Sequence, residues 1–316
     1  MPGTDFVMKK FTFIVSLTNN DNDYQMEQAA SAEEAARRLG VKIQLVYAEN
    51  DAIMQSQQLL KIIQSNSTSH PDGIIFEPVG TGLPQVARAA ASAGIGWVVL
   101  NRDVDYASDL RRTYRVPVFG ITSNHEEIGR IQGRQFAALL PKGGNVLYIQ
   151  GPSESLATKQ RTAGMYETKP ANVQVKLMKG NWTEASAQKA VASWLRLSTS
   201  QETLIDVIAS QDDGMAIGAR KAFQEVSDET LRNRWLALPY TGCDGMPKTG
   251  QAWVKRGLLA ATIINPANTG KALEMLMHAL QVGTMPPDRT MTAPVSFPAL
   301  DALAAAHAEK VRIMSA

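Results

Sequence analysis

The chain has 316 residues, of which 44% are hydrophobic and 20% are charged, which is enough apolar sequence for about two folded domains. The 32 Lys and Arg residues nearly balance 30 Asp and Glu, giving a net charge of +2, and this argues against a nucleic-acid-binding protein with a basic face. A single cysteine, Cys243, excludes an intrachain disulfide, a Cys-rich zinc site and a CxxC redox pair.

Catalytic and metal-binding motifs are missing from the sequence. The run from Gly151 to Ser155 lacks the last glycine of a GxSxG elbow, and Pro247 stands where a phosphate-binding loop needs glycine. None of the histidines lies in an HExxH motif, and they are far apart: His70, His125, His278 and His307. We therefore expect no catalytic residues, no metal site and no cofactor.

The first residues imitate a signal peptide, because Met8-Lys9-Lys10 precede an apolar run. That run is short, and Thr18 and Asn19 follow it in place of a small-residue cleavage site. Aromatic and β-branched residues dominate 11–17, which predicts a first buried strand. The protein is therefore expected to be cytoplasmic or a mature form without its leader. No apolar stretch approaches 18 residues, so we expect no transmembrane helix.

Short apolar runs alternate with longer amphipathic stretches along the whole chain. The apolar runs predict strands over 11–17, 42–47, 73–76, 97–100, 118–121, 145–149, 173–178, 204–209, 236–240 and 260–264. The amphipathic stretches predict a set of helices over 25–39, 82–93, 125–140, 184–197, 213–226, 247–256 and 268–282. This alternation is typical of an α/β protein.

Strand–helix units of about thirty residues imply right-handed crossovers and parallel sheets. Ten strands are more than one compact sheet needs, and the pattern restarts at Gly143-Gly144. We therefore predict an α/β fold with two doubly wound parallel-sheet lobes. The N-terminal lobe is assigned to residues 1–122 plus 266–293, and the C-terminal lobe to 123–265 plus 294–316. No low-complexity linker divides the lobes, and passage of the chain between them as packed segments favours a hinge.

Polar residues follow many of the predicted strands, and ligands of such sheets bind beyond the carboxyl ends of the strands. Amides, carboxylates and arginines occur there together with Tyr24 and Trp182. This combination suits a polyhydroxylated ligand, because paired donors and acceptors match vicinal hydroxyls and flat rings stack on C–H faces. Single residues of this kind are also typical of turns and helix caps. One of Asp212 and Asp213 is expected to cap the following helix, and the other to face the cleft.

A series of ordered segments carries a wider resemblance: IVSLTNN, DGIIFEPV, WVVLNRDV, ITSN, NVLYIQGPSESLATKQRTAG, IASQDDGMAIGARKAF, TGCDGMP and GLLAATIINP. With these segments the chain resembles the type I periplasmic sugar-binding proteins of the ribose- and galactose-binding group. The effector domains of LacI-type repressors share their fold. The resemblance extends from Phe11 to about Phe297 and implies two lobes joined by a multi-strand hinge around a ligand cleft.

The resemblance also implies the ligand-binding positions. They fall on Asn20, Tyr24, Glu77, Asn101, Arg102, Ser123, Asn124, Arg161, Trp182, Asp212, Asp244 and Asn265. Glu77 stands where the family has an amide, and the loop containing Asn20 is longer and lacks the family's usual Phe pair. The extra carboxylates favour a neutral or amino-bearing sugar over a sugar acid, whereas Arg102 and Arg161 oppose that preference.

The function implied by the resemblance is that of a solute-binding protein without enzymatic activity. It would capture a small sugar in the cleft and deliver it by hinge closure to the membrane permease of an ABC-type transporter. The same resemblance implies a periplasmic monomer with no nucleic-acid partner. One alternative is a sugar-sensing effector related to LacI-type regulators, lacking a DNA-binding domain because only ten residues precede Phe11. Another is an enzyme on a doubly wound fold. It is disfavoured because Gln85 stands in place of the last glycine in the dinucleotide-binding pattern that Gly80-Thr81-Gly82 begins.

Overall fold

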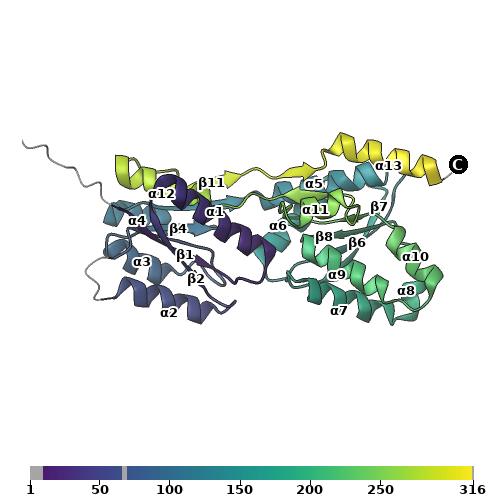
Figure 1. Cartoon of the computed structure of the whole chain (residues 1–316), viewed down its shortest axis with the longest axis horizontal. Helices are drawn as coiled ribbons and strands as arrows, with labels where there is room; N and C mark the ends of the chain where they lie inside the picture. The colour runs from purple at the N-terminus through teal and green to yellow at the C-terminus, as the bar shows by residue number, and fades with distance from the viewer. Residues whose placement is uncertain (1–9, 66–69, 315–316) are drawn as a thin grey trace, which may run out of the picture. The chain divides into compact units, whose positions relative to one another are not determined.

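The computed structural model describes residues 10–65 and 70–314, so Met8 and Lys9 of the signal-like segment lie outside the described residues (Figure 1). The chain forms two compact α/β units. Unit 1 runs to Ser123 and takes in Ala267–Thr292. Unit 2 comprises Asn124–Pro266 and continues from Ala293.

Unit 1 is built on a six-stranded sheet whose neighbouring strands are all parallel, in the order β11-β5-β4-β3-β1-β2. Its strands are β1 (Thr12–Leu17), β2 (Lys42–Tyr47), β3 (Gly73–Phe76), β4 (Gly96–Leu100), β5 (Val118–Ser123) and β11 (Arg289–Thr292). Every residue of β3, β4 and β5 is buried. Parallel strands covered on both faces read as continuous apolar runs, which is why the sequence revealed them.

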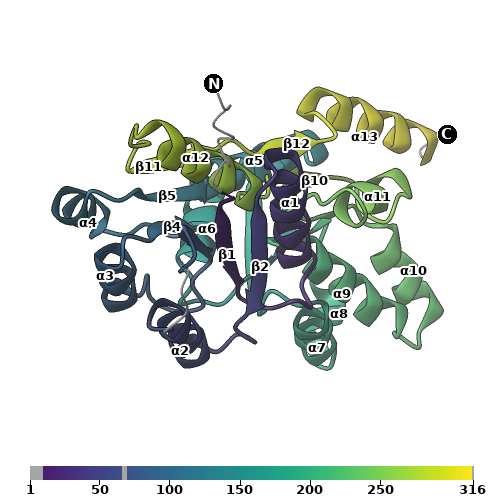
Figure 2. The same ribbon diagram turned by 60° about the vertical axis from the view of Figure 1, so that its left-hand side comes forward.

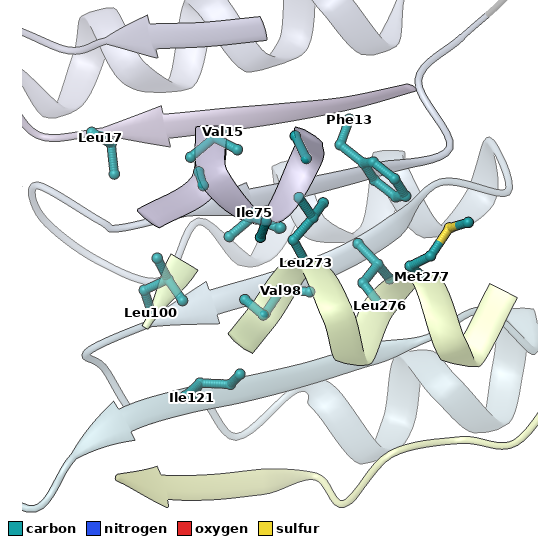
Figure 3. Packing of buried hydrophobic residues seen from close by; sticks show 14 of the residues in the cluster. Phe13, Val15, Leu17, Ile75, Val98, Leu100, Ile121, Leu273, Leu276 and Met277 are labelled. Carbon is teal, nitrogen blue, oxygen red and sulfur yellow. The ribbon is translucent and has the colours of Figure 1, made fainter. Parts of the chain in front are cut away.

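The helices of unit 1 cover both faces of this sheet. They are α1 (Asp23–Leu39), α2 (Ala52–Ile63), α3 (Pro84–Ser92), α4 (Ala107–Tyr114) and α12 (Thr269–Val282). Figure 2 shows α4, α3 and α2 in succession along one side of the sheet. On the opposite face, Leu273 and Leu276 of α12 pack against Val98 and Ile75 of the strands (Figure 3). A segment distant in sequence thus completes the core of unit 1.

Unit 2 contains a parallel four-stranded sheet in the order β7-β6-β8-β9 and an antiparallel pair, β10-β12. The strands are β6 (Gly144–Gln150), β7 (Val173–Lys179), β8 (Val207–Ser210), β9 (Tyr240–Thr241), β10 (Thr262–Ile264) and β12 (Val295–Phe297). The pair continues the larger sheet, because Thr241 forms a parallel bridge with Ala261.

Two groups of helices enclose the unit 2 sheet. Helices α5 (His125–Leu139), α6 (Leu156–Thr168) and α13 (Leu300–Met314) pack with one set of strand residues. Helices α7 (Glu184–Leu195), α9 (Asp213–Gln224), α10 (Glu229–Ala237) and α11 (Gly250–Lys255) pack with the other. A short helix, α8 (Ser198–Glu202), follows α7. Within residues 10–65 and 70–314, no helix has the length and hydropathy required to span a bilayer.

Two predictions about secondary structure were wrong. The run 236–240 is a strand only at Tyr240, where β9 begins, because Leu236 and Ala237 end α10, which Asp228 caps and which buries Trp235 completely. The set of predicted helices was incomplete, and it lacked α2, α4, α6, α8, α10 and α13. Helix α6 shows why, since it buries Arg161 and Gly164 instead of an apolar stripe.

Candidate functional site

A polar network lies at the carboxyl ends of β3 and β4 in unit 1. Glu77 follows β3, and its carboxylate accepts hydrogen bonds from Gln25 Nε2 at 3.0 Å and from Asn101 Nδ2 at 3.1 Å. Asn101 follows β4, and its Nδ2 also donates to the Tyr24 hydroxyl at 3.1 Å. The Oδ1 of Asn101 accepts from Asn268 Nδ2 at 2.9 Å. The amide of Asn101 therefore links residues from three separate parts of unit 1.

Asn268 connects this network to two further strands. Its Nδ2 lies 3.4 Å from the Ser123 hydroxyl at the end of β5, and its Oδ1 accepts from the Thr292 hydroxyl of β11 at 3.0 Å. Its backbone N–H donates to Gln28 Oε1 of α1 at 2.8 Å. Asn268 is completely buried, so both ends of its side chain are committed to holding the strand ends together.

Only some of the ligand residues predicted in the first half of the sequence belong to this network. Four belong to this network: Tyr24, Glu77, Asn101 and Ser123. Asn20 is exposed and lies outside it. Asn124 caps α5, because its Oδ1 accepts from the backbone N–H of Glu127 at 3.0 Å. The structure therefore gives Asn124 a local structural role in unit 2.

Arg102 lines a cavity of about 360 Å³ in unit 1, separate from the network. Gly120 and Thr122 of β5 contribute to its wall, together with Arg289 of β11. The guanidinium of Arg289 forms an ion pair with Asp103 at 2.8 Å. Arg102 and Arg289 thus place two cationic side chains around this cavity.

Arg161 is the centre of a second polar cluster, in unit 2. It comes from α6 and is 5% exposed. Its Nη1 donates to the backbone oxygen of Gln211, and its Nη2 lies 3.4 Å from Asp244 Oδ1. Its guanidinium also lies over the Trp182 ring, 5.4 Å from the ring centroid. An arginine held on three sides presents its charge in a fixed direction.

His125 packs against the same guanidinium. Its Nδ1 accepts a hydrogen bond from Arg161 Nε at 3.4 Å. Burial, followed by the charge of Arg161, lowers the pKa of His125 to about 3. The imidazole is therefore neutral and carries its hydrogen on Nε2, an atom that has no partner among the described residues. The sequence correctly predicted a first-turn helix residue here and missed this contact.

Asp244, which pairs with Arg161, also interacts with the carboxyl group of Asp212. Asp212 follows β8, caps α9 and accepts from the Met215 N–H at 2.7 Å. Burial raises the pKa of Asp212 well above its usual range, and the neighbouring charge of Asp244 raises it further. Asp244 also lies near the Cys243 thiol, whose Sγ is 3.7 Å from its Oδ1. Burial raises the pKa of Cys243 strongly, so this thiol stays protonated.

The carboxylate of Asp213 is buried inside unit 2, where both of its oxygens accept hydrogen bonds from the protein. Its Oδ2 accepts from the Gly245 N–H and its Oδ1 from the Thr262 hydroxyl, both at 2.7 Å. A Cβ added at Gly242 or Gly250 would lie 2.1 or 2.0 Å from its oxygens. The backbone therefore closes tightly around this carboxylate, and the expectation that it faces the cleft is not met.

Three of the predicted ligand residues have left-handed backbone conformations. The φ angle is +53° at Asn101, +58° at Trp182 and +99° at Asp244. Asn and Asp tolerate this region better than other residues, whereas an aromatic residue there is unusual. Such conformations are concentrated at functional sites, where surrounding contacts hold them. Gly151 holds Trp182, because a Cβ there would lie 2.2 Å from the indole ring.

Asn265 is the last predicted ligand residue, at the end of β10. It is 1% exposed, and its backbone N–H donates to the Asp244 carbonyl at 3.0 Å. Its Oδ1 has no hydrogen-bond partner among the described residues. A buried amide oxygen without a partner is costly, which favours a role in binding a group from outside the chain.

The ligand residues predicted from the sequence do not include Gln25, Asn268 or Gln211. Gln211 Nε2 donates to the Tyr148 hydroxyl at 3.1 Å, and its Oε1 accepts from the Gly151 N–H at 3.0 Å. Gln211 immediately precedes Asp212, so its place at a strand end was a usable signal. Gln25 and Asn268 are the first residues of the predicted helices 25–39 and 268–282, so no strand-end signal marked them. Over residues 10–65 and 70–314, no three His, Cys, Asp or Glu side chains are grouped so as to hold a metal ion.

Comparisons with known proteins agree on one family and one fold. A family model described as a periplasmic binding protein domain matches residues 13–285. The D-allose-binding periplasmic protein of Escherichia coli (strain K12) is 25% identical over 283 residues, which cover 87% of this chain and 86% of that protein. A putative rhizopine-binding protein of Rhizobium meliloti is 28% identical over 200 residues, or 61% of this chain and 60% of that protein.

A solved structure shows the same fold at low sequence identity. It is an ABC transporter periplasmic solute binding protein from Actinobacillus succinogenes 130z with bound D-allose. It superposes with a TM-score of 0.77 at 20% identity, covering 91% of this chain and 97% of that one. The predicted α/β fold with two parallel-sheet lobes is confirmed.

Proposed function

The chain belongs to the periplasmic binding protein domain family, and we propose that it binds a small sugar and delivers it to the permease of an ABC-type importer. Proteins of this family bind solutes and do not catalyse a reaction on them, so the chain is not an enzyme. The family match over residues 13–285 carries the proposal. The relatives named for D-allose binding support a sugar as the ligand class.

Sugar recognition requires both donors and acceptors, together with a flat apolar surface. We propose that Glu77 and Asn101 of unit 1 bind sugar hydroxyls, with Arg161 and Asp244 of unit 2 binding others. Trp182 would stack against the C–H face of the ring. All of them except Arg161 follow the carboxyl ends of parallel strands, where open α/β sheets bind their ligands. Arg161 comes from α6, the helix that follows β6.

Delivery and location complete the proposal. The names of the relatives describe periplasmic and transporter-associated proteins, and this supports a periplasmic receptor for the present chain. We propose that it acts as a monomer. Closure of two lobes about a hinge stays a prediction from the family resemblance.

Thermal unfolding against a sugar panel tests the proposal. A ligand at 100 times its dissociation constant adds about 2.7 kcal/mol of native stability. For a domain of this size each kcal/mol raises the melting temperature by about 2–4 °C, so the expected shift is several degrees. The panel contains pentoses, hexoses, amino sugars and uronates, with NAD as a probe of the enzyme alternative.

A matched pair of variants locates the effect. Arg161→Ala should abolish the sugar-induced shift, because it removes a buried donor with fixed direction. Arg112→Ala is the control, since this side chain is 77% exposed and pairs with its helix neighbour Asp109. A sugar shift that survives in Arg161→Ala would contradict the assigned residues. A shift with NAD alone would overturn the proposed function.

A further inference from the structure

Gln211 is a buried side chain to which the proposed sugar contacts assign no role. It follows β8 and is completely buried. Its Oε1 accepts a hydrogen bond from the backbone N–H of Gly151 at 3.0 Å. Its Nε2 lies 3.1 Å from the Tyr148 hydroxyl, 3.1 Å from the Thr158 carbonyl oxygen and 3.0 Å from the Thr162 hydroxyl. Because both ends of the amide are bonded without access to water, the side chain is held in one orientation.

The bond to Gly151 connects Gln211 with Trp182. Gly151 directly follows β6, and the indole lies so close to it that a Cβ on Gly151 would be 2.2 Å from Cζ2 and 2.4 Å from Cη2 of the ring. Trp182 has a φ of +58°, which an aromatic residue keeps only where its surroundings hold it. The backbone position of Gly151, which Gln211 fixes, therefore decides where the ring of Trp182 can lie.

The backbone of Gln211 makes a second connection, to Arg161. Its carbonyl oxygen accepts a hydrogen bond from Arg161 Nη1. The same guanidinium lies over the Trp182 ring, 5.4 Å from the ring centroid. Gln211 is thus bonded through its main chain to one proposed sugar-binding residue and, through Gly151, holds the other.

A closed set of buried hydrogen bonds fixes Gln211 from inside unit 2. The Tyr148 hydroxyl of β6 donates to Gln132 Oε1 at 2.5 Å, and Gln132 Nε2 of α5 donates to the Ser210 carbonyl oxygen at 2.8 Å. Ser210 ends β8 and directly precedes Gln211. Tyr148, Gln132 and Gln211 are all completely buried. A buried network in which every member is bonded favours a single arrangement, so the position of Gln211 is fixed relative to the sheet.

From these contacts we infer that Gln211 is a positioning residue for sugar binding, which sets the place of the Trp182 ring and the direction of the Arg161 guanidinium. Its complete burial keeps its own side chain from touching a ligand. The inference rests on the proposed function, because it takes these two residues as sugar contacts. A displaced ring loses its stacking on the sugar, and a turned guanidinium loses its hydrogen-bond geometry. Loss of the Gln211 amide should therefore weaken sugar binding although no ligand contact is removed.

A double-mutant cycle on sugar affinity tests the positioning role. Gln211→Met keeps a long unbranched side chain in the core and removes the side-chain hydrogen bonds of Gln211. Trp182→Phe keeps an aromatic ring and lacks the two indole carbons that face Gly151. Gln211→Met should weaken sugar binding about tenfold in the presence of Trp182 and at most about threefold in the Trp182→Phe protein. A purely structural role would give equal losses in both, because uncoupled residues contribute additively.

Isothermal titration calorimetry of the full chain supplies the affinities. The probes are D-ribose, D-allose, D-galactose, D-glucosamine and D-glucuronate, which represent the pentoses, hexoses, amino sugars and uronates of the thermal panel. The probe that binds the unaltered protein most tightly is then used for every protein of the cycle.

Tryptophan emission at saturating sugar gives a second readout. The part of the sugar-induced change that disappears in Trp182→Phe belongs to Trp182. This part should decrease in Gln211→Met even when every molecule has sugar bound, because the indole ring then lies elsewhere. A loss of stability alone would not alter the emission of folded, saturated protein.

Gln135→Met is the matched control. Gln135 of α5 is completely buried, and its Nε2 donates to the Thr262 carbonyl oxygen at 3.1 Å and to the Ser296 hydroxyl at 3.0 Å. Neither bond involves the backbone that faces Trp182. The variant should lower the melting temperature, as Gln211→Met does, and should leave the sugar affinity within about twofold of the unaltered protein.

Tyr148→Phe takes the place of Gln211→Met if that variant does not fold. It fills the same space and removes the hydroxyl that joins Gln211 to Gln132. Gln211 keeps its other bonds, so the expected loss of affinity is smaller, about threefold, and it should again disappear in the Trp182→Phe protein.

The outcomes separate this inference from the proposed function. Equal losses with and without the Trp182 indole would overturn the inference and leave sugar binding intact. An affinity within about twofold of the unaltered protein in Gln211→Met, or in Tyr148→Phe where it takes its place, would do the same. A sugar-induced emission change in which Trp182 has no part would also overturn the inference. Failure of every probe to bind the unaltered protein would overturn the inference and the proposed function together.

Discussion

The carboxylate of Asp213 accepts a 2.7 Å hydrogen bond from the backbone N–H of Gly245, and this contact fixes the loop that contains Asp244. Asp213 begins α9, whereas Gly245 lies in the segment between β9 and α11. The two adjacent aspartates therefore have different roles. Asp212 caps α9 and interacts with the carboxylate of Asp244, whereas Asp213 holds the backbone of the loop that contains Asp244.

Asp213→Asn should cost about 1–3 kcal/mol of unfolding free energy, because an amide nitrogen would face a hydrogen-bond donor in a closed site. The loop that contains Asp244 should also shift, so sugar affinity should fall. Urea unfolding measures the stability, and calorimetry measures the affinity. Asp228→Asn, the exposed cap of α10, is the control and should lose at most a few tenths of a kcal/mol. Equal losses in both variants would contradict the role of Asp213.

Gly129→Ala should separate α5 from α6. A Cβ at this position would lie 2.0 Å from the backbone oxygen of Arg161, and backbone atoms cannot move aside cheaply. We expect a loss of about 1–3 kcal/mol or more together with weaker sugar binding, because Arg161 moves with its helix. Gly257→Ala is the control. Its φ is +72° but nothing lies within 4 Å, so only backbone strain of about 1 kcal/mol applies.

His125 should make the protein acid-sensitive. Its pKa is about 3 in the folded protein and about 6.5 in the unfolded chain, so protonation favours unfolding. Stability should fall as the pH is lowered from about 6.5 toward 3, by up to about 1.4 kcal/mol per pH unit. Urea unfolding across this range should show a shallower decline in His125→Gln. His278→Gln, on the exposed side of α12, should decline like the unaltered protein.

Asp212 should affect stability in the opposite direction. Its pKa is raised in the folded protein by burial and by Asp244, so its contribution is present at low pH and is lost as the pH rises through the folded-state value. Asp212→Asn removes this loss and should gain stability relative to the unaltered protein on the alkaline side. Melting temperatures measured from acidic to alkaline buffers test this. Parallel curves for the two proteins would count against a strained carboxyl pair.

Asn268→Ala should weaken the unit 1 network. The side chain is completely buried, and its loss removes the partner of Asn101 Oδ1 and one of two acceptors of the Thr292 hydroxyl. We expect a cost of about 1–3 kcal/mol and a lower sugar affinity through misplacement of Asn101. Asn19→Ala removes an Asn–Asn hydrogen bond of the same 2.9 Å length at an exposed position. That control should change stability by less than about 0.5 kcal/mol.

The central strands of both parallel sheets could be predicted because burial on two faces leaves a nearly unbroken apolar run in the sequence. The predicted set lacked β11 and β12, whose residues are mostly exposed or half-buried. The runs over 73–76 and 42–47 became β3 and β2 with the predicted bounds. Helices that pack through small or polar residues were harder to find. Helix α6 has a weak amphipathic pattern, since Gly164 contacts the α5 backbone and Arg161 is buried. The spacing of apolar residues in α6 therefore predicts neither the contact of Gly164 with α5 nor the burial of Arg161.

The sequence identified those site residues that follow a predicted strand or match a family motif. Glu77, Asn101, Arg161 and Asp244 were identified because each follows an apolar run or matches a family motif, and the structure places each in a polar network. Asn268 and Gln25 were missed, because their partners are distant in sequence. Asn124 was assigned to the ligand, although its side chain caps α5.

The sequence by itself determined the α/β class, the alternation of strands and helices, and the family, because these follow from local burial patterns and ordered motifs. Only the tertiary structure decided how the polar residues divide their work. Asp212 and Asp213 are neighbours with the same side chain, yet one meets Asp244 and the other meets Gly245. Their difference arises from strand and helix directions that bring distant segments together, and residue type alone does not encode it.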